Sequence, residues 1–206
     1  LKAQSEGYAL GAFNVENMEM AQAVVSAAEM ENAPVIVQTT PGTLGYADPE
    51  VFAGIVGVLA KKAKVPVALH LDHGNSFDTA QRAVLAGYTS IMIDGSTLPY
   101  ADNIEVTRLV VKRAGDIPVE AELGTVGGKE DDHEAEAQYT DPEQARDFVE
   151  KTGVFSFAVA IGTAHGVYKG EPKLDLDRLT AIREIVDIPL VLHGTSGVPE
   201  VQVRAC

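Results

Sequence analysis

Residues 66–74 read Pro-Val-Ala-Leu-His-Leu-Asp-His-Gly, an apolar run that begins at a proline and ends in polar side chains. A proline favours an extended entry to a strand, and a continuous apolar run is typical of a strand buried on both faces. Six other runs along the chain have a similar character. The seven predicted strands are residues 9–15, 34–39, 66–72, 90–95, 118–124, 155–162 and 189–194.

Amphipathic stretches separate these runs, with Ala, Leu and Val at helical spacing and charged residues on the opposite face. The predicted helices include residues 18–31, 77–86, 103–114, 142–152 and 175–186. Strands that alternate with helices in this way predict an α/β protein with a parallel sheet. Such a sheet is either doubly wound and open or closed into a barrel.

The positions of the polar residues favour the barrel. They gather at the C-terminal ends of nearly every predicted strand, where a (β/α)8 barrel builds its active site, whereas an open sheet gathers them at one switch point. These residues are Asn14, Gln38, Asp72, His73, Asp94, Glu122, the 162–166 turn and His193. We therefore predict a single TIM (β/α)8 barrel domain over residues 1–206. Seven units are visible, residues 197–206 begin the helix after the seventh strand, and the C-terminal strand and helix are expected to be missing from this chain.

Composition limits the classes of function. The chain is 46% hydrophobic and 22% charged, which is ordinary for one folded domain. A formal net charge of −14 argues against nonspecific binding to nucleic acid or to an anionic membrane surface. No apolar stretch is long enough to cross a membrane, and the single cysteine, Cys206, cannot form a disulfide within the chain. A cytoplasmic protein is expected.

The run at 66–74 also carries candidate chemistry. Side chains alternate along a strand, so His70 and Asp72 share one face, and His73 is expected at the exit where the chain turns. A carboxylate beside an imidazole suits a general base next to a metal ligand. For His70 alone, a hydrogen-bonded core histidine is the favoured interpretation. For Asp72 and His73 alone, capping of the next helix explains the pattern as well as catalysis does.

Two further histidines repeat this pattern. His165 and His193 each lie at the end of a predicted strand, and each precedes a glycine. Three histidines at three strand ends can converge above a barrel, and three protein ligands with an open fourth position are typical of catalytic zinc. The neighbouring glycines leave backbone N–H groups accessible to an anion. His133, in an acidic segment, is expected to lie in a solvated loop.

Five strings together carry a family resemblance. They are ALHLDHG (68–74), SIMIDGS (90–96), VEAELGTVGGKEDD (119–132), AVAIGTAHGVYKGEP (158–172) and PLVLHGTSGVP (189–199). In this order they resemble the class II, zinc-dependent fructose-bisphosphate and tagatose-bisphosphate aldolases over essentially the whole chain. The resemblance implies Asp72 as the base and His73, His165 and His193 as zinc ligands.

The same resemblance implies further site residues. Asp94 and Glu122 correspond to acidic residues that can form a second metal position, and Glu130 corresponds to a mobile-loop acid that transfers protons. The substrate-binding positions fall on Asn14, Gly166, Gly194, Thr195 and Ser196. The family's eighth strand has no counterpart, because the chain ends at Cys206.

The implied reaction is reversible cleavage of fructose 1,6-bisphosphate, or of its C4 epimer tagatose 1,6-bisphosphate, to glycerone phosphate and glyceraldehyde 3-phosphate. The string GTAHG slightly favours the tagatose-type branch of the family, but it does not decide which C4 epimer is the substrate. The family also implies a monovalent cation, Na⁺ or K⁺, near the phosphate, and a homodimer or homotetramer.

Three rival functions stay open at this point. A Schiff-base aldolase needs a lysine on a barrel strand, and we expect every lysine in a helix, a loop or a terminus. The lysines are at positions 2, 61, 62, 64, 112, 129, 151, 169 and 173. A barrel metallohydrolase often carries a His-x-His pair on its first strand, which residues 11–17 do not contain. A noncatalytic or differently specific sugar-phosphate-binding metal barrel is the remaining alternative.

Overall fold

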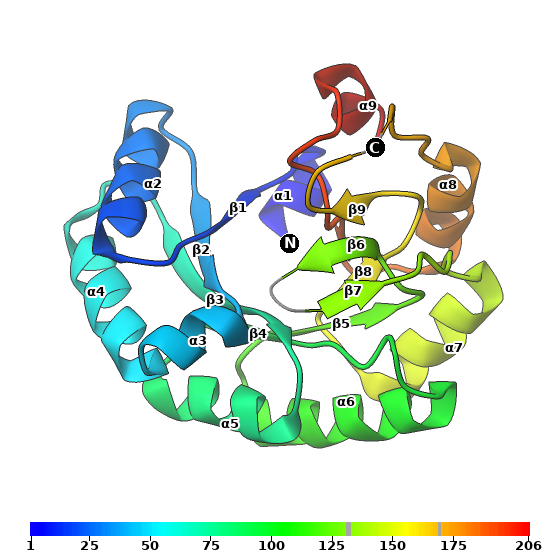
Figure 1. The fold of residues 1–206 in the computed structure, drawn as a ribbon, viewed down its shortest axis with the longest axis horizontal. Helices are drawn as coiled ribbons and strands as arrows, with labels where there is room; N and C mark the ends of the chain where they lie inside the picture. Colours follow the sequence, from blue (N-terminus) through cyan, green and yellow to red (C-terminus); the bar gives the residue numbers. More distant parts are fainter. Residues whose placement is uncertain (131–132, 169) are drawn as a thin grey trace. The chain divides into compact units, whose positions relative to one another are not determined.

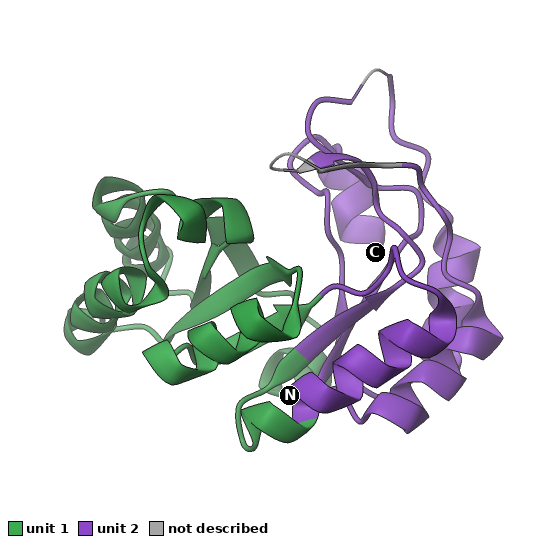
Figure 2. Cartoon of the chain, turned by 60° about the horizontal axis from the view of Figure 1, so that its bottom comes forward, with its two compact units in different colours: residues 1–93, 112–119 green, residues 94–111, 120–206 purple. Residues whose placement is uncertain are grey.

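The computed structural model describes residues 1–130, 133–168 and 170–206. Two compact units make up the chain (Figure 2). Unit 1 comprises Leu1–Ile93 and Lys112–Val119, and unit 2 comprises Asp94–Val111 and Glu120–Cys206. Each unit therefore draws on two separate segments of the sequence.

The main sheet contains seven strands in the order β1-β2-β3-β4-β5-β8-β10. They are β1 (Gly11–Asn14), β2 (Val35–Thr39), β3 (Val67–Gly74), β4 (Ser90–Ile93), β5 (Val119–Leu123), β8 (Ser156–Val159) and β10 (Leu190–Val191). The pairs β1–β2, β2–β3, β3–β4, β5–β8 and β8–β10 are all parallel. Because the spatial order follows the sequence order, the sheet has no point at which the strand order reverses, and the doubly wound alternative is wrong. The seven predicted strands are confirmed.

The prolines before the strands help to set the parallel register. The carbonyl of Pro66, just before β3, accepts a hydrogen bond from the Val35 N–H of β2. Pro118 does the same for Ile91, and Pro189 for Phe157. A proline lacks an N–H but keeps its carbonyl, so it suits this position, where only an acceptor is needed.

Unit 1 holds the first four strands and five helices. These are α1 (Lys2–Glu6), α2 (Met18–Met30), α3 (Pro41–Tyr46), α4 (Pro49–Lys62) and α5 (Phe77–Ala86). Asn17, Thr40 and Ser76 cap α2, α3 and α5 through their side-chain oxygens. Helices α2, α4 and α5 pack on the strands and on one another (Figure 1). The strands contribute side chains with no exposed surface, such as Val37, Leu71 and Ile91.

Unit 2 holds most of α6 (Tyr100–Ala114), together with α7 (Pro142–Thr152), α8 (Leu176–Ile185) and α9 (Glu200–Ala205). The helix expected near the end of the chain is thus present as α9. Unit 2 also contains a second sheet in the order β7-β6-β9, formed by β6 (Gly127–Glu130), β7 (His133–Ala135) and β9 (Ala164–His165). Strands β6 and β9 are parallel, whereas β6 and β7 are antiparallel. The sequence did not predict this sheet.

Strand β8 is shorter than predicted because the residue that follows it bonds elsewhere. Residues 155–162 were expected to form one strand, yet β8 ends at Val159. The backbone N–H of Ala160 donates to the Thr140 hydroxyl, and its carbonyl accepts from the Thr140 N–H. The chain therefore leaves the sheet after Val159 and approaches the segment before α7.

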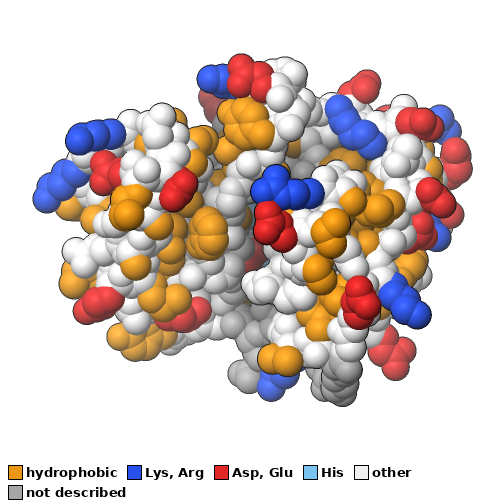
Figure 3. All heavy atoms as spheres, turned by 90° about the horizontal axis from the view of Figure 1, so that it is seen from above, with side chains coloured by type: hydrophobic (Ala, Val, Ile, Leu, Met, Phe, Trp, Pro, Cys, Tyr) orange, Lys and Arg blue, Asp and Glu red, His pale blue; other side chains and the backbone are white. Residues whose placement is uncertain are grey.

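On the face drawn in Figure 3, acidic and basic side chains are interspersed, with hydrophobic side chains between them. Over the whole sequence, acidic residues outnumber basic ones, which gives the formal net charge of −14. Among the residues described, none of the helices has both the length and the apolar character needed to span a membrane.

Candidate active site

A bulge in β3 places the two central residues of the 66–74 run. Leu71 lies opposite Ile91 of β4, but the next paired residue of β3 is Gly74, opposite Ile93. Two residues of β3, Asp72 and His73, therefore face a single residue of β4, which is the pattern of a β-bulge. His73 has a φ of 45°, in the left-handed region. The expectation that His73 lies beyond the strand is wrong, since β3 continues through it to Gly74.

The bulge puts neighbouring side chains on the same side. Consecutive residues of a regular strand point to opposite faces, yet His73 Nε2 lies 4.0 Å from Asp72 Oδ1. The His73 backbone N–H donates to the sulfur of Met92, the β4 residue opposite the bulge. The carboxylate and the imidazole can thus act on one ligand.

Asp72 is 1% exposed and is oriented by two amides. Its Oδ2 accepts hydrogen bonds from Asn14 Nδ2 at 2.9 Å and from Gln38 Nε2 at 2.8 Å. Gln38 Nε2 also lies 2.7 Å from Asn14 Oδ1. The three residues come from the ends of β1, β2 and β3, so the parallel sheet brings them together, as their strand-end positions predicted.

Of the two structural alternatives for this segment, one is confirmed and the other is wrong. His70 is 6% exposed and its Nδ1 lies 2.8 Å from Ser90 Oγ, so the favoured interpretation of a hydrogen-bonded core histidine is confirmed. The helix-capping alternative for Asp72 and His73 is wrong. The N-cap of α5 is Ser76, whose side chain accepts from the Thr79 N–H.

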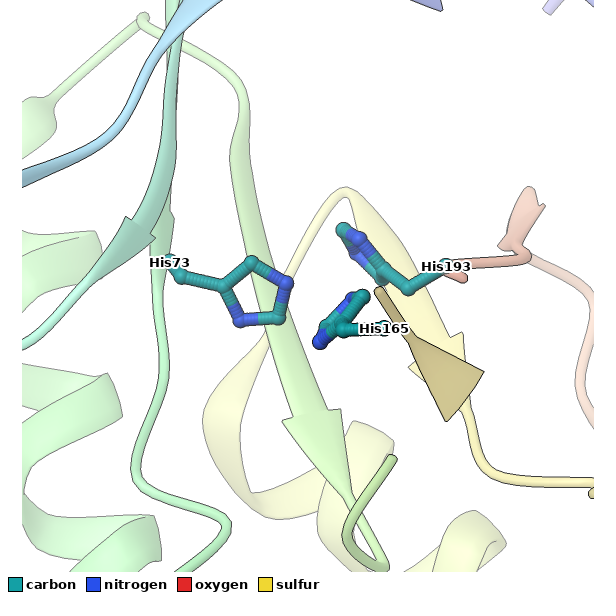
Figure 4. Close-up of side chains that lie close together, drawn as sticks. All are labelled: His73, His165 and His193. Atoms are coloured by element: carbon teal, nitrogen blue, oxygen red, sulfur yellow. The ribbon is translucent and has the colours of Figure 1, made fainter. Parts of the chain in front are cut away.

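His165 and His193 lie together in unit 2. Their rings are edge to face, with centroids 5.9 Å apart (Figure 4). His165 ends β9, where it pairs with Gly128 of β6. A Cβ on Gly128 would lie 2.2 Å from the His165 carbonyl oxygen, and Gly128 has a φ of 95°. Only a glycine permits this close approach of β6 to the backbone that carries His165.

A buried carboxylate orients His193. Glu120 Oε1 lies 2.8 Å from His193 Nε2, and both side chains are mostly buried. A hydrogen bond to Nε2 favours the tautomer whose Nδ1 lone pair is available to a metal. Glu120 is not among the site residues predicted from the sequence. The signal was present, because Glu120 and Glu122 are two residues apart in a strand and so share a face.

The acidic residues predicted for a second metal position have separate local contacts. Glu122 is 1% exposed, and its Oε1 accepts from the Val126 N–H at 3.1 Å. Asp94 Oδ1 accepts from the Ser96 N–H at 2.9 Å. Asn103 Nδ2 donates to the Glu122 carbonyl, which links α6 to the end of β5. Each carboxylate is therefore held at a strand end by backbone N–H groups.

The predicted substrate-binding glycines occupy the turns beside the two histidines of unit 2. Gly166 has a φ of 79° and Gly194 a φ of 67°, both in the left-handed region. A Cβ on Gly194 would lie 2.7 Å from the backbone carbonyl of Ala164. Thr195 and Ser196 follow in the same turn, and Ser196 is exposed.

Tyr168 is a further residue that the sequence analysis missed. Its hydroxyl accepts from the Ala164 N–H at 2.7 Å and donates to the Gly194 carbonyl at 2.8 Å. Burial raises the pKa of the Tyr168 phenol, and the hydrogen bond from the Ala164 backbone only partly opposes this effect. The hydroxyl consequently stays protonated and able to donate at neutral pH.

Predictions around the acidic segment have mixed outcomes. The backbone of Glu130 ends β6, but its side chain lies outside the described part of the structure. The backbone of His133 belongs to β7, so the expected loop is wrong at that position. Lys129 lies on β6 rather than in a loop, although this strand belongs to the second sheet. Lys169 lies outside the described residues.

Comparison with known proteins places this chain in a family. The family model for class II fructose-bisphosphate aldolase matches residues 1–206. The chain belongs to the class II fructose-bisphosphate aldolase family. A class II aldolase fold is accordingly the correct description of the α/β architecture, and the predicted TIM-barrel class is confirmed over the seven units present.

Solved structures of aldolases agree with this assignment. The YdjI aldolase of Escherichia coli K12 has a TM-score of 0.88 and 40% identity over 99% of this chain and 74% of its own. A candidate fructose-1,6-bisphosphate aldolase of Coccidioides immitis has a TM-score of 0.93 and 32% identity, over 100% and 75%. Fructose-bisphosphate aldolase of Campylobacter jejuni has a TM-score of 0.80 and 27% identity, over 99% and 70%. Membership of this class II family supports an aldolase, and the family is generally metal-dependent.

Proposed function

We propose that this chain cleaves a ketose 1,6-bisphosphate by a reversible aldol reaction, with zinc bound by His73, His165 and His193 and with Asp72 as the base. The observation that carries the proposal is the pairing of two of these imidazoles within unit 2. The rings of His165 and His193 lie edge to face, with centroids 5.9 Å apart (Figure 4). His73 is proposed as the third ligand from its place beside Asp72 in β3.

The donor set fits zinc. Three imidazole nitrogens with an open fourth position are the ligands of many catalytic zinc sites. The hydrogen bond between His193 and Glu120 supplies the carboxylate support that zinc-bound histidines commonly have. When bound, zinc would act as a Lewis acid toward the oxygens of a sugar phosphate.

Asp72 is proposed to accept the proton of the C4 hydroxyl during cleavage and to return it during condensation. This role needs hydrogen-bond reach to the substrate more than it needs an unusual pKa. Asn14 and Gln38 donate to Oδ2 of the carboxylate and so hold the proposed base in one orientation. Asn14 is also the proposed contact to a substrate hydroxyl.

Asp94 and Glu122 are proposed as the acidic ligands of a second metal position, as the family resemblance implies. Each carboxylate accepts a hydrogen bond from a backbone N–H near the end of a strand, so both are held in place locally.

The phosphate is proposed to bind at the turns that contain Gly166, Gly194, Thr195 and Ser196. Left-handed glycines leave backbone N–H groups uncovered, and such groups bind anions well. Lys129 and Lys169 are not required as nucleophiles, because the proposed chemistry does not use a Schiff base.

The proposed substrates are fructose 1,6-bisphosphate and tagatose 1,6-bisphosphate. The names of the Coccidioides and Campylobacter relatives favour the first, whereas the GTAHG string favours the tagatose branch. The two sugars differ only at C4, the carbon whose hydroxyl Asp72 would contact. Positioning near Asp72 is therefore the proposed origin of any preference.

Turnover of both epimers tests this function. Purified protein should release glyceraldehyde 3-phosphate from one or both sugars, lose activity on chelation and regain it with Zn²⁺. Borohydride treatment in the presence of substrate should leave activity intact. His165→Ala should stay inactive after zinc is added back, whereas Glu143→Gln, an exposed change on α7, should recover as wild type does. Sugar-phosphate binding without turnover in the zinc-loaded protein would instead favour the noncatalytic barrel.

The remaining predictions, made from the family resemblance or from the composition and pattern of the sequence, belong to the same proposal. They are Glu130 as the proton-transferring lid acid, a monovalent cation near the phosphate, a homodimer or homotetramer, a cytoplasmic location and a single barrel domain over residues 1–206. Activity measured in Na⁺, in K⁺ or in neither ion tests the monovalent cation directly. Native mass spectrometry tests the oligomeric state.

A further inference from the structure

We propose that Tyr168 is a positioning residue that locks together the two backbone turns carrying His165 and His193. The inference rests on the proposed function, since it assigns these histidines to a metal. The hydroxyl of Tyr168 bonds to one backbone group beside each histidine. It accepts from the N–H of Ala164, which precedes His165, and donates to the carbonyl of Gly194, which follows His193.

The two turns are already in close contact at this point. A Cβ on Gly194 would lie 2.7 Å from the Ala164 carbonyl carbon and oxygen and 2.9 Å from its nitrogen. The turns therefore approach each other along their backbones, where no side chain separates them. The Tyr168 hydroxyl fixes the relative position of the two turns, because one oxygen serves both of them.

The tyrosine ring is itself held by packing. A Cβ on Gly197 would lie 2.5 Å from Tyr168 Cδ2, so the ring lies against the backbone after the Gly194 turn. A side chain at position 197 would therefore collide with the ring of Tyr168, and glycine avoids this collision. The ring and the hydroxyl of Tyr168 together connect the segment around β9 to the turn that follows β10.

The expected consequence is on metal binding rather than on the chemical step. Tyr168 lies beside the histidines and is not itself a ligand, so its loss should leave the donor atoms present but poorly aligned. Supporting residues of this kind typically change metal affinity by about 10–100-fold when mutated. Turnover at saturating zinc should fall much less than zinc affinity does.

Tyr168→Phe tests the proposal, because it removes the hydroxyl and retains the ring. Zinc affinity is measured by competition with a chromophoric chelator, and the Co²⁺-substituted protein is examined by visible absorption. We expect a loss of zinc affinity of about 10–100-fold and a shifted Co²⁺ band. Gly197→Ala, which would displace the ring without removing the hydroxyl, should have the same direction of effect. It keeps the proposal testable if Tyr168→Phe folds poorly.

Tyr100→Phe is the matched control. The Tyr100 hydroxyl also lies near two groups in unit 2, since it donates to Asp147 Oδ2 at 2.7 Å and lies 3.3 Å from the Gln144 carbonyl oxygen. Neither of these bonds involves a histidine turn. It should cost stability without changing zinc affinity or the Co²⁺ band. Unchanged zinc affinity in Tyr168→Phe, or an equal loss in both variants, would overturn the proposal.

Hydrogen exchange of the Ala164 amide in metal-free protein tests the link between the two turns separately from the proposed function. It should be faster in Tyr168→Phe than in wild type, whether or not the wild-type protein binds zinc. Faster exchange in a protein that binds no zinc would refute the proposed function while leaving the link between the turns standing. Unchanged exchange in a protein that does bind zinc would refute the link alone.

Discussion

The region around the base and the region around the two unit 2 histidines are built in different ways. Asp72 and His73 are neighbours on one long strand, and a bulge within that strand brings their side chains together. His165 and His193 lie far apart in the sequence, and a tyrosine hydroxyl and a glycine contact bring their turns together. The first region is set mainly by local backbone geometry, whereas the second depends on tertiary contacts. Changes in the residues that support Asp72 should therefore have effects separate from changes in the residues that support His165 and His193.

The largest expected effect is that of Asp72→Asn on turnover. Asparagine keeps an oxygen that can accept from Asn14 and Gln38, but it cannot take up a proton. We expect kcat to fall by about 10²–10⁴-fold, the usual contribution of a general base. Zinc content, measured by metal analysis, should stay at the wild-type level. Asp78→Asn, an exposed change at the start of α5, serves as the control. Loss of zinc together with activity would contradict the separation of the two regions.

Glu120→Gln should affect the metal and spare the base. The glutamine retains a weaker hydrogen bond to His193 but removes the charge that supports the imidazole as a ligand. Zinc affinity should fall by about tenfold, at the lower end of the range for such supporting residues. Glu184→Gln on α8 is a control at a carboxylate outside the site. A fall in kcat at saturating zinc as large as that of Asp72→Asn would show that Glu120 acts directly in the reaction.

The smallest effect concerns Tyr88, which supports the base region through Thr39, the neighbour of Gln38. Burial raises the pKa of Tyr88 from 10.0 to about 12, because the phenolate would be desolvated. The folded state then holds this proton more tightly than the unfolded state. Tyr88 should therefore stabilise the fold fully below about pH 10 and lose that contribution as the pH rises toward 12.

Urea unfolding at several pH values checks this expectation. Between pH 9 and pH 11.5, wild type should lose about 1–3 kcal/mol more of its free energy of unfolding than Tyr88→Phe does. Tyr46→Phe, at a tyrosine that is 76% exposed, should behave as wild type. Equal pH slopes for wild type and Tyr88→Phe would refute the role of this buried phenol. Turnover of Tyr88→Phe at pH 8 should be close to that of wild type.

The sequence predicted the parts of the fold that follow from periodicity and the site residues that follow from strand ends. Apolar runs such as 66–72 and the helix over Phe77–Ala86 were visible because burial imposes a regular pattern on them. The placement of Asn14 and Gln38 beside Asp72 followed from parallel strands having their C-terminal ends at one edge.

The parts that were missed depend on contacts between distant segments. The strands of the second sheet are two to four residues long, too short to carry a period. Nothing local in the sequence signals that Tyr168 bonds beside both histidines. The bulge at Asp72 and His73 arises from the register against β4, and a single strand does not reveal its partner's register.

The left-handed backbone of His73 implies a conflict between stability and function. A side chain other than glycine in this conformation costs about 1–2 kcal/mol, and glycine would avoid the cost while removing the imidazole. A library selected only for heat resistance should drift toward glycine or asparagine at position 73. A library selected for turnover should retain histidine, so the two selections would diverge at this position and mark it as one where evolution accepted a less stable chain.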